Sequence, residues 1–202
     1  MDEQRLVALL GELVALTNET EWVEFKENRA DETEIGEYIS ALSNSAALLG
    51  EKIAFMVWGV RDSDHELVGT SFKPSETRRG NENLDSWLSH QLQPRIHFKV
   101  HELDHEGKHF VVFEIPPALH TPVRFNGQEF IRMGSYKKSL RDYPEKERTL
   151  WAVLSRCTFE TAVAASDLTA DEALGLLDYP SYFDLTGQPL PSDKTALVDR
   201  LV

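Results

Sequence analysis

The chain has 202 residues, of which 41% are hydrophobic and 27% are charged, and its formal net charge is -13. This composition is typical of a folded protein with one sizeable core, or with one domain and an appendage. No apolar run approaches the roughly 20 residues that span a bilayer, so we expect a cytoplasmic protein with no membrane partner. The single cysteine excludes an intrachain disulfide.

The charge is unevenly distributed along the chain. Residues 67–141 carry 11 basic and 8 acidic side chains, whereas residues 1–66 carry 5 and 15, and residues 142–202 carry 5 and 11. The total charge disfavours nucleic-acid binding, because affinity for phosphate comes mostly from Lys and Arg. The basic middle third is nevertheless compatible with a basic strip beside an acidic pocket.

The acidic stretch Glu19–Glu27 is the most informative part of the N-terminal region. In it Val23 and Phe25 alternate with Glu24 and Lys26, which predicts a strand that buries one face. Carboxylates this close repel one another, so the chain needs a solvated strand end, a partner cation such as Lys26, or a bound divalent metal to keep them. A charged strand edge is the structural alternative.

The elements around this strand follow from apolar periodicity. Residues 3–16 and Glu32–Leu49 have helical spacing. The apolar run Ile53–Trp58 predicts a buried strand, Arg61–Asp64 an acidic turn, and Leu67–Gly69 a returning strand.

A polar loop over Thr70–Asn83 and a helix over Asn83–Gln93 come next, and Pro94 ends the helix. The pair Asn126-Gly127 predicts a tight hairpin. Further expected elements are strands over 96–103, 108–115, 123–125 and 129–133, and helices over 145–156, from about 168, and over 194–202.

Three segments occur in the order and spacing of a known family. They are Glu-Thr-Glu-Trp-Val-Glu-Phe-Lys at Glu19–Lys26, Gly-Val-Arg-Asp at Gly59–Asp62, and Phe-Ile-Arg-Met-Gly-Ser at Phe130–Ser135. Together they resemble the Schlafen AlbA_2 domain, also described as a DNA-binding domain and as divergent AAA-4. Asn44 and Gly50 also match the family's pattern after the second helix, but its glycine pair is absent, which argues against a phosphate cradle there.

The resemblance implies a metal-dependent endoribonuclease acting on structured RNA such as transfer RNA, with Mg²⁺ or Mn²⁺ as the cofactor. By position, the metal ligands and catalytic carboxylates would be Glu19, Glu24 and Asp62, with Lys26 steadying them or the phosphate. Strand alternation would separate Glu19 from Glu24, so Glu19 is expected to precede the strand proper. Glu21 and Asp64 are the substitutes if this register is wrong.

Basic side chains in the middle third are candidates for contacting the nucleic-acid backbone, with loop or strand-end solubility as the alternative. They are Arg78, Arg79, Arg124, Arg132, Lys137 and Lys138. Two other functions stay open: a non-catalytic DNA-binding module of a bacterial transcriptional regulator, and a protein-interaction or assembly domain that forms a homo-oligomer.

We expect an α/β protein of the α+β type, with a mixed, largely antiparallel sheet on which the helices pack. Residues 1–143 would form the AlbA_2-like domain. Residues 144–202 would form a small helical extension, or a linker to further C-terminal domains.

Overall fold

The computed structural model describes residues 3–16, 20–155, 169–191, 193 and 196–198, in two compact units, Met1–Cys157 and Thr158–Val202. The helices are α1 (Glu3–Val14), α2 (Glu32–Leu49), α3 (Leu84–Gln91), the 3-10 helix η1 (Leu140–Asp142), α4 (Pro144–Leu154), α5 (Ala170–Leu176) and α6 (Tyr179–Thr186). The strands are β1 (Val23–Lys26), β2 (Ala54–Trp58), β3 (Arg78–Arg79), β4 (Glu82–Asn83), β5 (Leu92–Gln93), β6 (Lys99–His105), β7 (Lys108–Ile115), β8 (Arg124–Phe125), β9 (Gln128–Met133) and β10 (Tyr136–Ser139).

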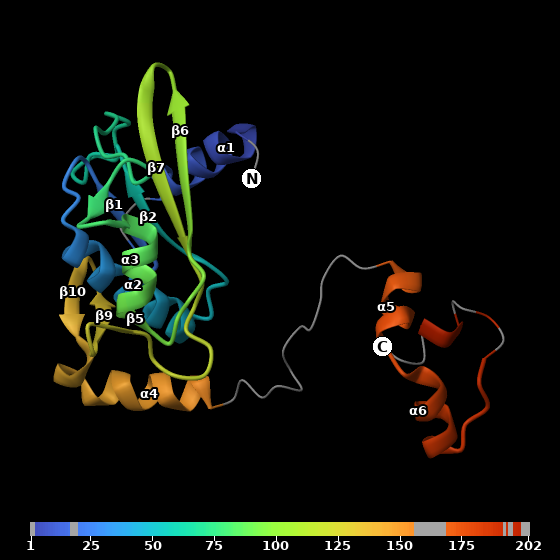
Figure 1. Ribbon diagram of the computed structural model, residues 1–202. Helices are drawn as coiled ribbons and strands as arrows, with labels where there is room; N and C mark the ends of the chain where they lie inside the picture. The colour runs from blue at the N-terminus through green and yellow to red at the C-terminus, as the bar shows by residue number, and fades with distance from the viewer. Residues whose placement is uncertain (1–2, 17–19, 156–168, 192, 194–195, 199–202) are drawn as a thin grey trace. The chain divides into compact units, whose positions relative to one another are not determined.

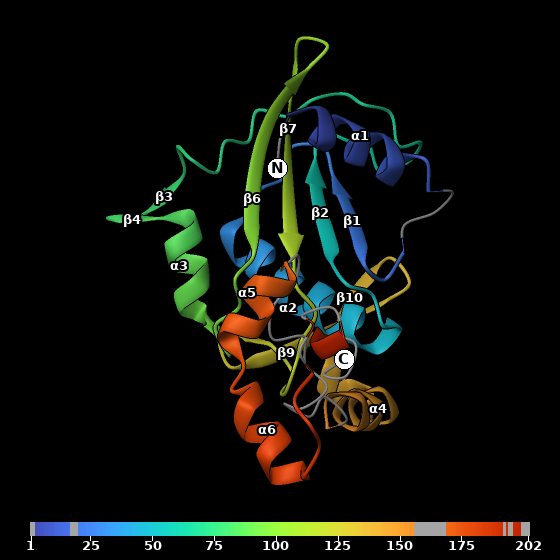
Figure 2. The same ribbon diagram turned by 90° about the vertical axis from the view of Figure 1, so that its right-hand side faces the viewer.

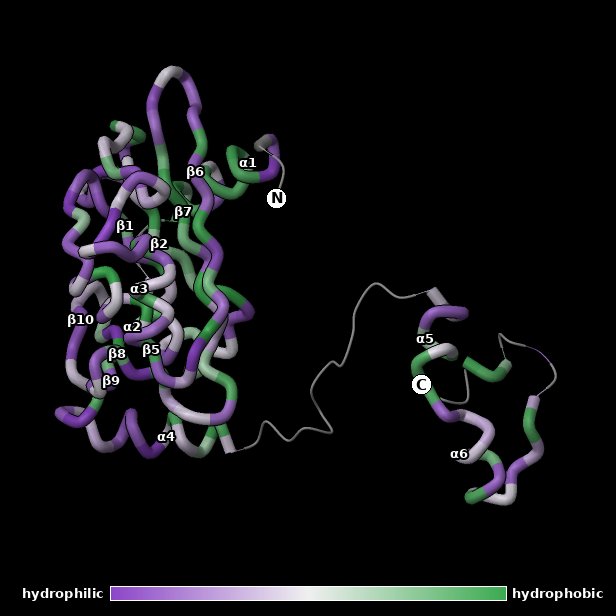
Figure 3. The backbone as a smooth tube through the Cα atoms, viewed as in Figure 1, coloured by the Kyte–Doolittle hydropathy of each residue, from purple (hydrophilic) through white to green (hydrophobic). Residues whose placement is uncertain are grey.

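The first sheet has the strand order β1-β2-β7-β6 (Figure 2). β1 and β2 run parallel, whereas β2, β7 and β6 pair antiparallel. The parallel pair requires a crossover, which α2 supplies. Every residue of β2 is buried, as its apolar run predicts, and Figure 3 shows the hydrophobic colouring of this part of the sheet.

The second sheet is antiparallel and has the strand order β10-β9-β8-β5, so β10 is an edge strand. The predicted Asn126-Gly127 turn joins β8 to β9, with both residues at positive φ, 50° and 78°. Mixed and mostly antiparallel sheets with packed helices confirm the predicted α+β class.

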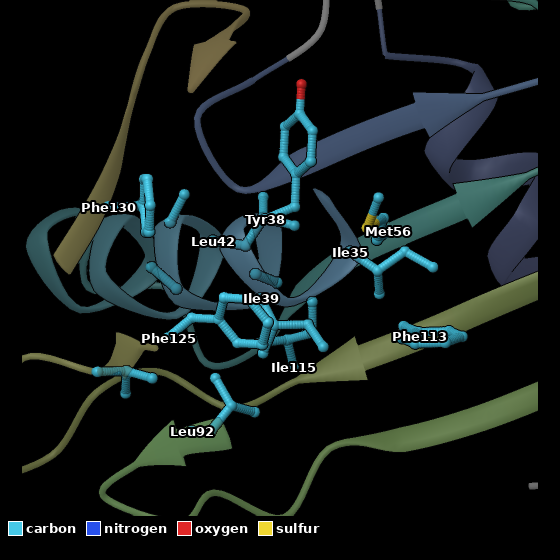
Figure 4. Close-up of a cluster of buried hydrophobic side chains, with 14 of the residues drawn as sticks. Ile35, Tyr38, Ile39, Leu42, Met56, Leu92, Phe113, Ile115, Phe125 and Phe130 are labelled. Atoms are coloured by element: carbon cyan, nitrogen blue, oxygen red, sulfur yellow. The ribbon is translucent and has the colours of Figure 1, made fainter. Parts of the chain in front are cut away.

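The two faces of the first sheet bury different clusters. On one face, α1 contributes Leu6, Leu10 and Leu13 to a cluster with the β1 residues Val23 and Phe25. On the other face, α2 lies between the two sheets (Figure 1), and its apolar side chains pack among residues of both sheets (Figure 4). α2 is therefore the central element of the first unit.

The ends of α2 are fixed by local capping. The Asp31 side chain accepts a hydrogen bond from the backbone N-H of Glu34 at 2.8 Å, and Gly50 ends the helix in the left-handed conformation with φ 74°. Both ends agree with the predicted range Glu32–Leu49.

A row of buried polar side chains on α2 holds the second half of the unit in place. The Asn44 amide donates to the backbone oxygens of Val123 and Phe130, both at 2.9 Å, and its oxygen accepts from the Val123 N-H at 2.8 Å. Ser40 Oγ donates to the Val123 oxygen at 2.7 Å and accepts from the Phe130 N-H at 3.1 Å. These bonds satisfy backbone groups that would otherwise be buried without partners.

Several expectations need correction. The returning strand Leu67–Gly69 is reduced to one isolated bridge between Val60 and Leu67, and the expected loop Thr70–Asn83 contains the short hairpin β3-β4. Strand β10 was not expected as a separate element. The helix Pro144–Leu154 packs its buried residues Leu150 and Leu154 into the core of the first unit.

The second unit has a small core of its own. Leu174, Phe183 and Leu197 form a buried cluster, and α5 begins with a capping box between Thr169 and Glu172. Most of the helix expected over 194–202 lies outside the described residues. Within the described part of the chain, no helix has both the length and the apolarity that crossing a membrane would require.

Gly36 in α2 permits a close approach to the core. A Cβ atom there would lie 2.0 Å from Cε2 of Phe125, a ring that is only 1% exposed. We expect Gly36→Ala to lower the free energy of unfolding by about 1–3 kcal/mol, because displacing a buried ring outweighs the gain in helix propensity of about 1 kcal/mol. Urea unfolding followed by tryptophan fluorescence measures this, since all four tryptophans lie in the first unit.

The matched control is Gly11→Ala in α1, where an added Cβ meets nothing within 4 Å. This variant should be neutral or more stable by up to about 1 kcal/mol. Equal shifts for the two variants would contradict the proposed clash at Phe125.

Candidate nucleic-acid interface

The alternation of β1 separates its apolar from its polar side chains as predicted, but Glu24 on the polar side is buried as well. Val23 and Phe25 lie in the α1 cluster, whereas the Glu24 side chain meets groups from α2 and β9. Glu24 is only 3% exposed. One of its carboxylate oxygens forms an ion pair with Lys26 and the other forms an ion pair with Arg132.

Arg132 on β9 is completely buried, with 0% exposure. Its backbone N-H donates to Ser45 Oγ on α2 at 3.0 Å, which fixes the strand against the helix. Burying a guanidinium is unfavourable unless it is paired, and the pair with Glu24 links the first sheet to the second. In this conformation Arg132 holds Glu24 and does not face the solvent.

Three cations surround the ring of Tyr38 on α2. Lys26 Nζ lies 4.5 Å, Lys137 Nζ 4.6 Å and Arg132 Cζ 5.4 Å from the ring centroid. These are cation–π distances. Lys137 also forms an ion pair with Glu37, and Figure 4 shows the Tyr38 hydroxyl pointing away from the other labelled core side chains. We call Lys26, Arg132 and Lys137 the cation cluster.

The surroundings raise the pKa values of both Lys26 and Tyr38. Burial raises the pKa of Tyr38, and the negative charge of Glu24 raises it further, so the hydroxyl stays protonated. Burial lowers the pKa of Lys26, but the charge and the hydrogen bond of Glu24 together with Tyr38 outweigh burial, so the pKa lies above its ordinary value. The cluster therefore sets three positive charges against the carboxylates Glu24 and Glu37.

The edge strand β10 carries a second group of side chains. Lys137 pairs in register with Arg132, so Tyr136 and Lys138 lie on the opposite side of the hairpin from the cation cluster. Tyr136 is 69% exposed, and Lys138 Nζ lies 5.6 Å from its ring centroid. Among the described residues no carboxylate pairs with Lys138. We call Tyr136 and Lys138 the edge pair.

The turn between β9 and β10 is tied to the segment before β1. The N-H of Gly134 donates to Glu21 Oε1 at 3.1 Å, and Lys146 Nζ lies 4.0 Å from the other oxygen of Glu21. Glu21 thus connects the start of β1 to this turn and to α4.

The predicted metal ligands are not all open to a structural test. Glu19 lies outside the described residues, and Asp62 is exposed in the turn after β2. The substitute Asp64 pairs with Arg61 at 3.0 Å. In the described parts of the chain, no three His, Cys, Asp or Glu side chains are grouped so that they could hold a metal ion. Because two cations already occupy both oxygens of Glu24, the described carboxylates do not fit Mg²⁺ or Mn²⁺ as they stand.

The other predicted phosphate contacts are spread over the first unit. Arg78 is exposed on β3. Arg79 lies over the Trp87 ring at 4.2 Å and 3.7 Å from Glu32. Arg124 pairs with Glu129 at 2.8 Å. The structure brings only Arg132 and Lys137 together with Glu24 and Lys26.

Sequence reasoning missed the two tyrosines of this region. Tyr38 has the helical spacing of the apolar face of α2, three residues after Ile35, and gives no polar signal of its own. Tyr136 follows the Gly-Ser turn and begins an alternating segment on β10, which could have indicated a further strand.

A family model described as "Schlafen, AlbA_2" matches residues 19–141. Comparison with curated proteins gave no match. Among solved structures, the chain is similar to the DIP2311 protein from Corynebacterium diphtheriae, with 14% identity, a TM-score of 0.46, and coverage of 90% of this chain and 35% of that chain. It is also similar to the N-terminal domain of a protein from Nitrosomonas europaea that is named as related to the ATP-dependent DNA helicase RecG. That match has 22% identity, a TM-score of 0.43, and coverage of 65% of this chain and 90% of that chain.

This chain thus spans about a third of the length of the first of these two proteins, with 35% covered.

Proposed function

Since this chain belongs to the Schlafen AlbA_2 family, which points to a nucleic-acid-binding domain, we propose that it binds nucleic acid through the edge strand β10, which Lys137 of the cation cluster ties to α2. In this proposal binding needs no metal ion. Glu24 is a positioning residue that holds two of the cations in place.

The observation that carries this proposal is the exposed Lys138 on an edge strand whose neighbour Lys137 belongs to the cation cluster. A lysine without a carboxylate partner can pair with a phosphate at little cost, because no existing ion pair has to be broken. Lys138 therefore provides positive charge on this hairpin that no carboxylate of the described residues neutralises, although the chain as a whole has a formal net charge of -13.

The pairing of Glu24 supports a binding function over a metal-dependent cleavage. A carboxylate that holds a metal must turn an oxygen toward it, whereas both Glu24 oxygens face cations of the protein itself. The same arrangement explains why an acidic residue is tolerated at 3% exposure in a phosphate-binding region.

The test is a fluorescence-anisotropy titration of labelled DNA and RNA with the full chain in the presence of EDTA, repeated at several salt concentrations. We expect the logarithm of the binding constant to fall linearly with the logarithm of the salt concentration. In Lys138→Ala the slope should become shallower by about 0.7 for single strands and about 0.9 for duplexes, because one phosphate contact is lost.

The matched control is Lys99→Ala, an exposed lysine on β6 at the far edge of the first sheet, which should keep the wild-type slope. Equal slopes for wild type and Lys138→Ala would place the interface elsewhere, and no binding at any salt concentration would overturn the proposal.

A separate experiment tests whether the chain cleaves RNA, by incubating it with total transfer RNA and manganese. We expect intact RNA. Fragments that appear with the wild type and vanish in a folded Glu24→Gln variant would contradict the role assigned to Glu24.

A further inference from the structure

The exposed ring of Tyr136 is unusual for this chain's first unit. It is 69% exposed, whereas Tyr38 on α2 is 8% exposed. A tyrosine ring is a large apolar surface, and its exposure on an edge strand leaves both the ring and the strand margin accessible. Neither the core nor the cation cluster uses this ring.

Tyr136 and Lys138 are two residues apart on a strand, so both project from the same side of the hairpin. Lys138 Nζ lies 5.6 Å from the Tyr136 ring centroid. An aromatic face beside an ammonium group matches the two parts of a nucleotide, since the ring can stack on a base while the ammonium pairs with a phosphate.

We propose that the edge pair binds single-stranded nucleic acid, with an unpaired base stacked on the Tyr136 ring and the neighbouring phosphate held by Lys138. This inference rests on the proposed function and adds the substrate class. In a duplex the base faces are covered by their neighbours, so the Tyr136 ring would have nothing to stack on.

The charge of the chain favours the same substrate class. Lys26 and Lys137 are each paired with a carboxylate, which leaves Lys138 as the lysine of this region that can hold a phosphate. Binding a duplex by charge alone takes several phosphate contacts, whereas this hairpin offers the single exposed lysine Lys138. Stacking supplies affinity that does not depend on positive charge, and it is open only to unpaired bases.

The experiment measures anisotropy of a labelled single strand and of the duplex of the same sequence, each as DNA and as RNA, with the full-length chain. We expect the wild type to prefer the single strand. Tyr136→Ala should weaken single-strand binding about 5- to 150-fold, because stacking of one base contributes about 1–3 kcal/mol. Its salt slope should stay unchanged, in contrast to Lys138→Ala, because no charge is removed.

Two further variants separate stacking from damage to the fold. Tyr136→Phe keeps the ring and should bind like the wild type. Tyr182→Ala removes a tyrosine of α6 that is 42% exposed and should also bind like the wild type. Tryptophan fluorescence should confirm that the first unit is folded in each variant.

A Tyr136→Ala variant with wild-type affinity for the single strand would overturn the stacking role, as would an equal loss on single strand and duplex. If Lys138→Ala still changed the salt slope in that case, the proposed function would stand without this inference. No binding of the wild type to any of the four nucleic acids would overturn both.

Discussion

Arg132→Met is expected to lower the free energy of unfolding of the first unit by about 3–5 kcal/mol. The substitution leaves the buried carboxylate of Glu24 with Lys26 as its remaining ion-pair partner, in a place that is only 3% exposed. Removing one partner of a buried pair is costly mainly because the other charge stays behind without it. Urea unfolding monitored by tryptophan fluorescence reports this unit alone, since it holds all four tryptophans.

The double variant Glu24→Leu with Arg132→Met is the control. It removes both charges, so we expect it to be more stable than Arg132→Met alone, because an apolar replacement of a buried pair is often close to neutral. Lys26 is 17% exposed at its side chain and can reach water once Glu24 is gone. The single variant Glu24→Leu completes the comparison. If the losses of unfolding free energy in Glu24→Leu and Arg132→Met simply added in the double variant, the two side chains would not be coupled.

Asn44→Ala should lower the free energy of unfolding by about 2–5 kcal/mol, because it removes three hydrogen bonds to the backbone of residues 123 and 130. The N-H of Val123 and the oxygen of Phe130 would be left buried without these partners, and each such group costs about 1–3 kcal/mol. The same urea titration measures the loss.

An exposed asparagine gives the comparison. Asn83 precedes α3 and its side chain makes no capping hydrogen bond, so Asn83→Ala should change the stability by less than about 0.5 kcal/mol. A similar shift for both asparagine variants would mean that the buried hydrogen bonds of Asn44 contribute little.

The elements that the sequence predicted well are those fixed by neighbouring residues. The range of α2 follows from its apolar spacing, from Asp31 before it and from Gly50 after it. The hairpin at Asn126-Gly127 follows from two residues that tolerate positive φ. In both cases the signal lies within a few residues of the feature, so one sequence is sufficient.

The features that the sequence did not predict depend on partners far along the chain. Glu24 and Arg132 are 108 residues apart, and nothing local to either shows that they meet. Arg132 was therefore interpreted as a phosphate contact, although it is buried. Likewise, the match of Asn44 to the family's pattern does not show that its amide donates a hydrogen bond to the backbone of Val123.

The end of the first unit illustrates the same limit. We expected a helical extension from residue 144 onward, and in the structure Leu150 and Leu154 pack into the core with α2. The compact unit runs to Cys157. The sequence of an amphipathic helix shows that it has an apolar face, but it does not show which element that face packs against.

The position of α2 between the two sheets has a consequence for synthesis on the ribosome. Hydrogen bonds of its serine and asparagine side chains reach backbone groups 73 to 90 residues further along the chain. At roughly 5–20 residues per second of translation, these partners emerge about 4–18 s after α2 does. During that interval the apolar side chains of the nascent α2 that pack on the second sheet have no partner to cover them.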